Sequence, residues 1–245
     1  IYTIGNFLMK DILYIVMPAY NEEANIERTV SEWYPIIEKH GGEGKSRLVI
    51  FNDGSRDNTF EKGKALMEKY PQFEMIDKAN SGHGPTVIKA YKYAISQGAD
   101  FVFQTDSDGQ TNPEEFEAFW QDRENNDAII GVRLQRGDGK DRAFVERVVC
   151  LLLRIYFGVK VKDANAPFRL MRATELEKYL SKLPEDYNIP NIMLTTYFTF
   201  YKSRVSFKEI SFKPRNAGTN SMNVKKIIGI GIKALGDFHR LKKAM

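Results

Sequence analysis

The chain has 245 residues, of which 42% are hydrophobic and 28% charged, as in an ordinary globular protein long enough to bury a large core. Its net charge of +4 is too small to indicate a nucleic-acid partner, and we expect none. The single cysteine, Cys150, excludes an internal disulfide framework and a cysteine zinc site and fits a reducing, cytoplasmic compartment. Three histidines argue against a multi-histidine metal site, and no uninterrupted apolar stretch approaches the ~18 residues of a membrane span.

The first half of the chain alternates short apolar runs with amphipathic segments of helical period. Residues 1–10 precede this pattern, lack the features of a signal peptide and are interpreted as an N-terminal extension. The alternation that follows predicts a mostly parallel sheet between helices. Strands are predicted at residues 12–17, 47–51, 73–76, 101–105 and 127–132, and helices are predicted to begin near residues 23, 59 and 85.

The second half has a different pattern. Residues 133–142 are charged and contain glycine, so we predict a mobile loop there. The segment that follows, residues 143–159, is strongly apolar and predicts a helix that is either buried or in contact with a lipid chain. Further helices are predicted at residues 174–182 and 190–201, an extended segment at 168–171, a strand at 205–213 and a basic amphipathic helix at 222–245.

The predicted strand at residues 101–105 ends in two carboxylates, Asp106 and Asp108, with Ser107 between them. Alternate residues of a strand point to the same side, so both carboxylates can reach one hard cation, and Gln110 can add a neutral oxygen. Mg²⁺ or Mn²⁺ held in this way takes its other ligands from water and substrate phosphates. The motif therefore indicates a metal–diphosphate site, with a polar strand-to-helix turn as the alternative.

Three other polar segments, at residues 18–22, 52–55 and 80–85, follow predicted parallel strands and can converge on the same edge of the sheet. Asp53 can accept hydrogen bonds from a base or a ribose, and the turn around His83 precedes a helix and suits phosphate. Each segment alone is common in turns, but together they indicate a nucleotide diphosphate with a metal. Neither G-x-G-x-x-G nor a P-loop motif is present, which disfavours those two nucleotide-binding folds.

These motifs resemble the family 2 glycosyltransferases of the GT-A fold over residues 12–221. The resemblance is carried by PAYNEE at residues 18–23, NDGSRD at 52–57, TDSD at 105–108, Asp163 with Phe168 and Arg169, and RNAG at 215–218. Within the family the chain looks most like the dolichyl- or polyprenyl-phosphate sugar synthases, whose D-x-D-x-Q motif matches Asp106, Asp108 and Gln110. It departs from that pattern at Pro167, where the signature has glycine, and at Ser221 and Met222 after the last motif.

The resemblance implies an α/β domain with a Rossmann-like, mostly parallel central sheet flanked by helices. Its domain would span residues 11–221, with a nucleotide-sugar and metal half at 11–132 (the donor half) and an acceptor half at 133–221. The metal ligands would be Asp106, Asp108 and Gln110, and Asp53 would read the base. The other expected substrate-binding residues are Pro18, Ala19, Tyr20, Glu22, Gly54, Ser55, Asn80, His83, Gly84 and Ser107.

By the same resemblance the chain would be an inverting, metal-dependent hexosyltransferase that uses a UDP- or GDP-sugar, and its acceptor would be a polyprenyl phosphate. Arg215 would neutralise the leaving group or hold the acceptor phosphate. The alternative is a sugar hydroxyl acceptor in cell-surface glycan synthesis, which requires a carboxylate base, with Asp163, Glu185 and Asp186 as candidates. A catalytically silent nucleotide-binding module is a third interpretation. The expected catalytic residues are Asp108, Asp163, Arg169 and Arg215.

The predicted helix at residues 222–245 carries six basic residues and one acidic residue. This pattern fits either a peripheral contact with the cytoplasmic face of a membrane or a core-packing helix with a solvated basic face. We therefore expect a cytoplasmic protein with the C-terminal helix as its candidate membrane contact.

Overall fold

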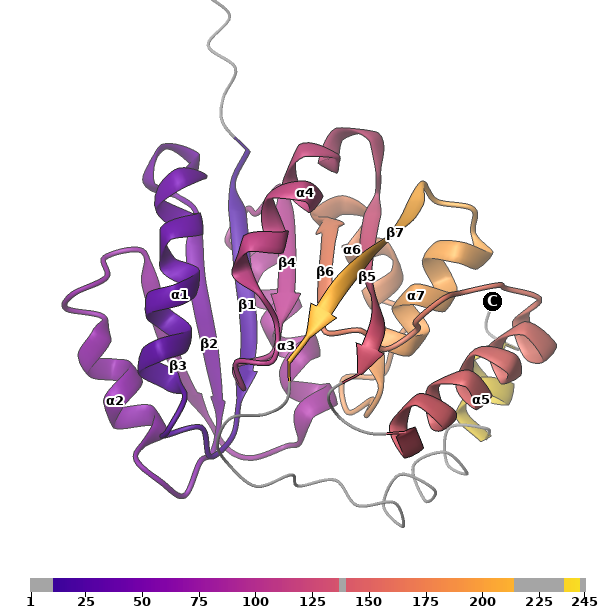
Figure 1. Ribbon diagram of the computed structural model, residues 1–245, viewed down its shortest axis with the longest axis horizontal. Helices are drawn as coiled ribbons and strands as arrows, with labels where there is room; N and C mark the ends of the chain where they lie inside the picture. The colour runs from indigo at the N-terminus through magenta and orange to yellow at the C-terminus, as the bar shows by residue number, and fades with distance from the viewer. Residues whose placement is uncertain (1–10, 137–139, 214–235, 243–245) are drawn as a thin grey trace, which may run out of the picture.

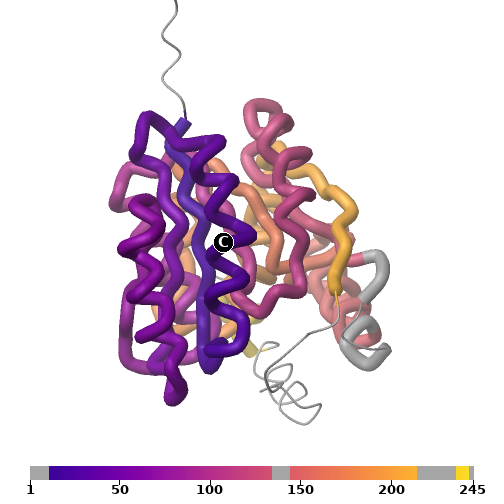
Figure 2. Tube along the Cα trace, turned by 60° about the vertical axis from the view of Figure 1, so that its left-hand side comes forward, coloured from indigo at the N-terminus to yellow at the C-terminus, as the bar shows by residue number. Residues whose placement is uncertain are grey.

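A seven-stranded sheet forms the centre of the molecule, with helices packed on its faces (Figure 1). The computed structural model describes residues 11–136, 140–213 and 236–242. The predicted N-terminal extension, Arg215 and most of the predicted C-terminal helix lie outside the described residues. Viewed from the side, the N-terminal half, drawn in indigo to violet, stands beside the C-terminal half, drawn in magenta to orange (Figure 2).

The strand order is β3-β2-β1-β4-β6-β5-β7. Neighbouring pairs β1–β2, β2–β3, β1–β4 and β5–β7 are parallel, whereas β6 is antiparallel to both β4 and β5. Six strands therefore run in one direction, which confirms the mostly parallel sheet, and their carboxyl ends share one edge, called the carboxyl edge below. The strands are β1 Leu13–Ala19, β2 Arg47–Asp53, β3 Phe73–Lys78, β4 Phe101–Thr105, β5 Ala128–Arg136, β6 Phe168–Arg172 and β7 Val205–Phe212.

The predicted helices of the described residues are present, but the predicted loop at residues 133–142 is wrong. β5 continues to Arg136, because it pairs with β7 as far as Phe212, and a helix begins at Lys140. Long-range pairing thus overrides a local composition that is typical of a loop. The main helices are α1 Ile26–Lys39, α2 Thr59–Leu66, α3 His83–Ser96, α4 Phe116–Gln121, α5 Lys140–Phe157, α6 Ala173–Leu180 and α7 Pro190–Phe200.

The hydrophobic core lies in two layers, one on each face of the sheet. Along β1, Tyr14 and Val16 belong to the layer that contains α3, α6 and α7. The alternate residue Ile15 belongs to the layer that contains α1 and α4, where Trp33 packs 5.5 Å from the ring of Phe103. This period of two explains why the strands read as continuous apolar runs, since a central parallel strand is buried on both faces.

Residues 236–242 are the described part of the predicted C-terminal helix, and they are helical. Phe238 and Leu241 are buried there, and the ring of Phe238 lies 5.7 Å from that of Phe157 at the end of α5. This segment therefore packs its apolar side chains into the core. Of the helices that the structure describes, none combines the length and hydrophobicity needed to cross a bilayer.

Gly84 joins the donor half to the acceptor half. It lies in the first turn of α3, and a Cβ atom there would come within 2.3 Å of the Tyr187 carbonyl oxygen and 2.4 Å of the Asn188 carbonyl oxygen. Only glycine allows the backbone of this loop to approach the helix so closely. The glycine that the sequence assigned to phosphate binding thus has a packing role.

We expect Gly84→Ala to destabilise the fold by about 1–3 kcal/mol, because the loop backbone must move away from the added methyl group. The measurement is the free energy of unfolding from urea titration. Gly236→Ala is the control, since no atom lies within 4 Å of a Cβ placed there. Equal stability of the two variants would contradict the proposed close packing.

Candidate functional site

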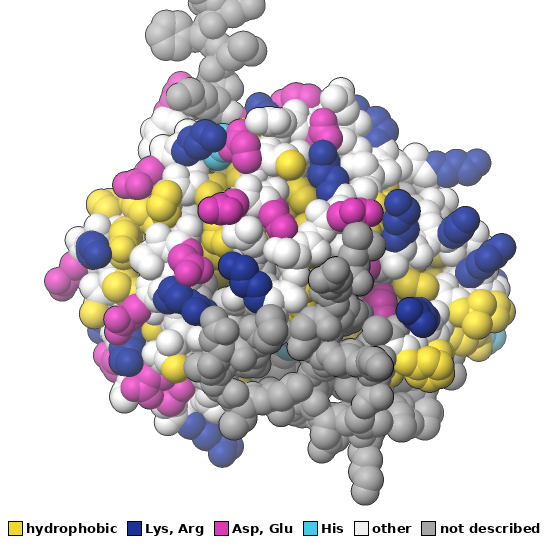
Figure 3. All heavy atoms as spheres, in the orientation of Figure 1, with side chains coloured by type: hydrophobic (Ala, Val, Ile, Leu, Met, Phe, Trp, Pro, Cys, Tyr) yellow, Lys and Arg dark blue, Asp and Glu magenta, His cyan; other side chains and the backbone are white. Residues whose placement is uncertain are grey.

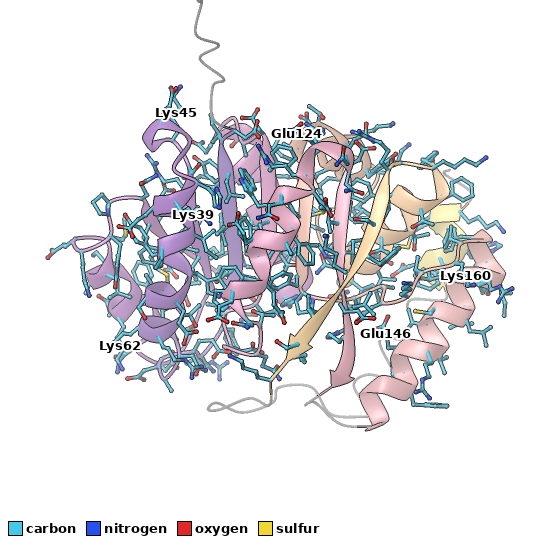
Figure 4. The ribbon with its side chains drawn as sticks, turned by 45° about the horizontal axis from the view of Figure 1, so that its top comes forward. Lys39, Lys45, Lys62, Glu124, Glu146 and Lys160 are labelled. Carbon is cyan, nitrogen blue, oxygen red and sulfur yellow. The ribbon has the colours of Figure 1, made fainter. Side chains whose placement is uncertain are left out.

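The structure brings the four polar segments predicted from the sequence together at the carboxyl edge. The sheet order places β1 between β2 and β4, so the segments that follow these strands are neighbours. The Ser107 hydroxyl donates to the Pro18 carbonyl oxygen at 2.8 Å, and the Asn21 N–H donates to the Ser55 hydroxyl at 3.0 Å. In Figure 4, Lys45 and Glu124 mark the opposite edge, while Lys62 and Glu146 lie toward the carboxyl edge.

The segment after β1 turns sharply at Asn21, whose φ is +55°. Its side-chain oxygen accepts a hydrogen bond from the Arg56 N–H at 2.9 Å, which joins this turn to the segment after β2. Glu22 is buried, its N–H donates to the Thr59 hydroxyl at 2.8 Å, and its carboxylate accepts from the Asn25 amide. Tyr20 remains 36% exposed. The tyrosine can therefore meet a ligand, whereas the Glu22 carboxylate helps to build the turn.

Asp53, at the end of β2, holds the segment that follows β3. Its carboxylate accepts hydrogen bonds from the Ser81 N–H at 2.8 Å and the Gly82 N–H at 2.9 Å, and it forms a buried ion pair with Lys78. Burial by itself raises the pKa of Asp53, but the bonds from Lys78 and Ser81 outweigh it and leave that pKa below its ordinary value. The role of Asp53 as the reader of the base stays a prediction, and the observed role is to fix this loop.

The segments after β2 and β3 also meet at Asn80. Its side-chain amide donates to the Asp53 carbonyl oxygen at 2.7 Å, and a Cβ at Gly54 would lie 2.8 Å from its backbone nitrogen. The close approach that Gly54 allows is therefore an approach to the neighbouring loop. His83 is exposed at the first residue of α3, where backbone N–H groups and the helix dipole favour an anion.

Asp106 and Asp108 lie just beyond β4, and the residue between them faces the interior. Ser107 is buried, while both carboxylates are only partly buried, as the alternation of a strand predicts. The Gln110 N–H donates to the Asp108 carboxylate at 3.1 Å, and the Gln110 side-chain nitrogen donates to the Lys213 carbonyl oxygen at 2.8 Å. That bond leaves the amide oxygen as the atom of Gln110 suited to a cation. Two carboxylates and one amide oxygen are a donor set that fits Mg²⁺ or Mn²⁺.

A buried chain of hydrogen bonds orients Asp106. The Gln104 amide nitrogen donates to the Asp106 carboxylate at 3.2 Å, and the Gln104 oxygen accepts from the Asn191 amide at 2.9 Å. The Tyr91 hydroxyl in turn donates to the Asn191 oxygen at 2.8 Å. Because all three supporting side chains are buried, these bonds are shielded from water and fix the carboxylate from α3 and α7.

Asp163 lies in a buried ion-pair cluster. Arg133, near the end of β5, donates to both of its carboxylate oxygens, from Nε at 2.8 Å and from Nη2 at 2.9 Å. Glu146 on α5 lies 3.7 Å from the same guanidinium and accepts the Ala164 N–H at 2.8 Å. A carboxylate held by a bidentate arginine is a poor proton acceptor, so this arrangement favours a structural role for Asp163 over the expected catalytic one.

Arg169, which the resemblance implied to be catalytic, has a completely buried side chain. It lies on β6, and its guanidinium donates to the carbonyl oxygens of Ala166 at 2.9 Å and Asn191 at 3.0 Å, among others. Burial lowers the pKa of Arg169 from its ordinary value. The guanidinium therefore ties the loop before β6 to α7, an arrangement that favours a structural role over the expected catalytic one.

The remaining expected catalytic residues are placed as follows. Arg215 lies outside the described residues. Glu185 and Asp186 are exposed in the loop before α7, and Glu185 pairs with Lys92 at 2.5 Å. The hydrogen bond from Lys92 lowers the pKa of Glu185, which makes its carboxylate a weaker proton acceptor.

The sequence alone did not identify Lys78, Arg133, Tyr91 or Asn191 as part of the site. The sequence did contain one clue to this network. Gln104 lies inside a run of buried apolar strand residues, where an amide must find hydrogen-bond partners. Its partners come from residues on α3 and α7, which only the folded structure brings near.

We expect Gln104→Met to lower the affinity for Mn²⁺ and nucleotide by about 10- to 100-fold, because Asp106 loses the donor that orients it. Isothermal calorimetry of nucleotide binding with Mn²⁺ measures the change. The control is Thr196→Val, which removes a buried hydroxyl that bonds only within α7, to the Ile192 carbonyl oxygen at 2.8 Å. An unchanged affinity in Gln104→Met, or an equal loss in both variants, would contradict a positioning role.

The chain has relatives among curated proteins, although it spans only part of each. It is 30% identical over 106 residues to a dolichyl-phosphate beta-glucosyltransferase of Trichomonas vaginalis, covering 42% of this chain and 31% of that protein. It is 26% identical over 172 residues to an undecaprenyl-phosphate 4-deoxy-4-formamido-L-arabinose transferase of Pseudomonas aeruginosa, covering 70% of this chain and 50% of the relative. The chain thus spans about a third to a half of the length of these relatives.

Solved structures share the fold. Glucosyl-3-phosphoglycerate synthase of Mycobacterium tuberculosis, in complex with Mn²⁺ and UDP-glucose, superposes with a TM-score of 0.68 at 17% identity, covering 95% of this chain and 79% of the other. The sheet and its helices therefore form a GT-A fold, as the resemblance implied. The sequence model of Glycosyl transferase family 2 matches residues 14–180, which is more than half of the chain. The chain belongs to glycosyl transferase family 2.

Proposed function

We propose that the chain transfers a sugar, with inversion, from a nucleotide-diphospho-sugar to a polyprenyl phosphate of the dolichyl or undecaprenyl type, using a divalent cation. The observation that carries this proposal is the pair Asp106 and Asp108, held at the carboxyl edge between the segment after β1 and the acceptor half. The curated relatives, which act on dolichyl and undecaprenyl phosphates, support the choice of acceptor.

The donor would lie across the carboxyl edge, with its diphosphate at the carboxylate pair and its nucleoside toward Tyr20 and Asp53. Asp106, Asp108 and the Gln110 oxygen would hold Mg²⁺ or Mn²⁺, and this cation would offset the negative charge that builds on the leaving diphosphate. The hydrogen bonds from Gln104 and from the Gln110 N–H set the orientation of the two carboxylates before the donor binds. Both UDP- and GDP-sugars are candidate donors for this arrangement.

The acceptor is better explained as a phosphate than as a hydroxyl. In the proposed reaction an acceptor phosphate oxygen bonds to the anomeric carbon while the bond from that carbon to the diphosphate breaks. A phosphate oxygen is already anionic, so no proton must be removed. A hydroxyl acceptor would need a carboxylate base, but Asp163 is bound by Arg133 and Glu185 is exposed beside Lys92.

We expect UDP or GDP with Mn²⁺ to raise the melting temperature by roughly 5–10 °C at about 100 times the dissociation constant, since that occupancy adds about 2.7 kcal/mol. The shift should require Mn²⁺ and should be lost in Asp108→Asn. Asp122→Asn is the control, because that carboxylate pairs with Lys208 near the start of β5, at the opposite edge. No shift with either nucleotide in the unchanged protein would reject the proposed donor site.

We expect Asp186→Asn and Glu185→Gln to keep the transfer rate to a short-chain polyprenyl phosphate within about twofold, since an anionic acceptor needs no general base. The measurement is kcat with a radiolabelled donor sugar. A loss of about 100-fold or more in either variant would indicate general-base catalysis. That outcome would favour a sugar hydroxyl as the acceptor.

A further inference from the structure

The helix α5 carries four exposed apolar residues on one side, called the α5 stripe: Phe144, Val148, Leu151 and Ile155. Their spacings of four, three and four residues align them along one face of a helix. Their exposed fractions are 67%, 38%, 55% and 67%. α5 lies at the outer end of the molecule (Figure 1), where Figure 3 shows hydrophobic side chains next to Lys and Arg side chains.

The opposite face of α5 accounts for the packing of the helix. Leu153 and Phe157 are buried in the core, and Glu146 faces inward, where it accepts the Ala164 N–H and lies near Arg133. The helix is thus fixed by its inner face. The α5 stripe therefore contributes little to folding and remains available for a partner.

The charges around the stripe indicate the chemistry of that partner. Arg147 and Arg154 are exposed on α5, and Lys160 and Lys162 are exposed just after it. Between residues 144 and 162 the only acidic residue is Glu146, which faces inward with a 14% exposed side chain. Within residues 144–162, exposed apolar side chains flanked by basic ones match the surface of a bilayer that contains anionic lipids.

We propose that the α5 stripe is the surface by which this chain docks on an anionic lipid bilayer. The inference rests on the proposed function in one respect, because a polyprenyl phosphate acceptor would be found in a bilayer. α5 follows β5, whose end lies at the carboxyl edge, so docking through the stripe holds that edge near the lipid headgroups. Phe238 and Leu241, in the described part of the predicted C-terminal helix, are buried and cannot make this contact.

The test is co-sedimentation of the full chain with vesicles of phosphatidylcholine, with and without phosphatidylglycerol. Phe144→Ser combined with Ile155→Ser should lower the apparent partition coefficient by at least about tenfold, because two large apolar side chains no longer enter the lipid. Arg147→Gln combined with Arg154→Gln should lower binding by about tenfold or more on the anionic vesicles only. The control is Met67→Ser, which changes a 39% exposed apolar residue after α2, and it should bind as the unchanged protein does.

Three outcomes would overturn the proposal. The first is unchanged vesicle binding by the Phe144/Ile155 variant, and the second is an equal loss in Met67→Ser. The third is a concentration-dependent dimer, seen by analytical ultracentrifugation of the unchanged protein and absent in the Phe144/Ile155 variant, which would assign the stripe to a second copy of the chain.

Nucleotide binding measured on the same variants separates this inference from the proposed function. The stripe lies on the outer surface, so the variants should keep their melting temperature and their calorimetric affinity for UDP or GDP with Mn²⁺. Vesicle binding that depends on the stripe, in a protein that binds neither nucleotide, would reject the proposed function and leave the docking surface standing. Nucleotide binding without any vesicle binding would reject the docking surface alone.

Discussion

The geometry of the candidate site depends on one buried amide, the side chain of Gln104. A buried amide without partners costs about 1–3 kcal/mol for each unsatisfied group, so the surrounding structure must supply them. Asn191 does so from α7, supported by the Tyr91 hydroxyl from α3, and the amide nitrogen of Gln104 donates to Asp106. Because the buried amide on β4 must be hydrogen-bonded, two helices are joined to the carboxylate that the proposed chemistry requires.

The ionic groups of the site follow a common pattern, in which buried charges fix the loops and the carboxylates of the proposed metal site are only partly buried. Asp53 with Lys78 holds the loop after β3, and Arg133 with Asp163 and Glu146 holds the segment before β6 against α5. A buried ion pair adds little net stability by itself, but losing one partner is costly, which makes such pairs effective at specifying one loop arrangement. The preorganised loops leave Asp106 and Asp108 at the surface of the edge.

Local patterns in the sequence were sufficient for most of the fold, because each predicted strand is a short apolar run and each polar motif follows a strand end. They also predicted Asp106, Asp108 and Gln110 as neighbours just beyond β4, and the role of the three as metal ligands stays a prediction. What local patterns did not predict depends on partners distant in sequence. β5 extends through Arg136 because of pairing with β7, and Arg169 is buried partly because the Asn191 carbonyl oxygen at the start of α7 accepts from it. Neither β7 nor α7 can be read from the residues nearby.

The reversed direction of β6 distinguishes the segment before it from the motifs that follow the other strands. Each of the other six strands reaches the carboxyl edge with its end, so the motifs that follow those strands are tied to their length and register. β6 reaches that edge with its beginning, so the segment between α5 and Phe168 arrives there from the outside of the sheet. Its buried contacts, from Asp163 to Arg133 and from Ala166 to Arg169, tie it to β5 and β6 and not to the strands that carry the proposed donor motifs. Under the proposed function, changes in the exposed residues of this segment would alter the acceptor and leave the donor motifs in place.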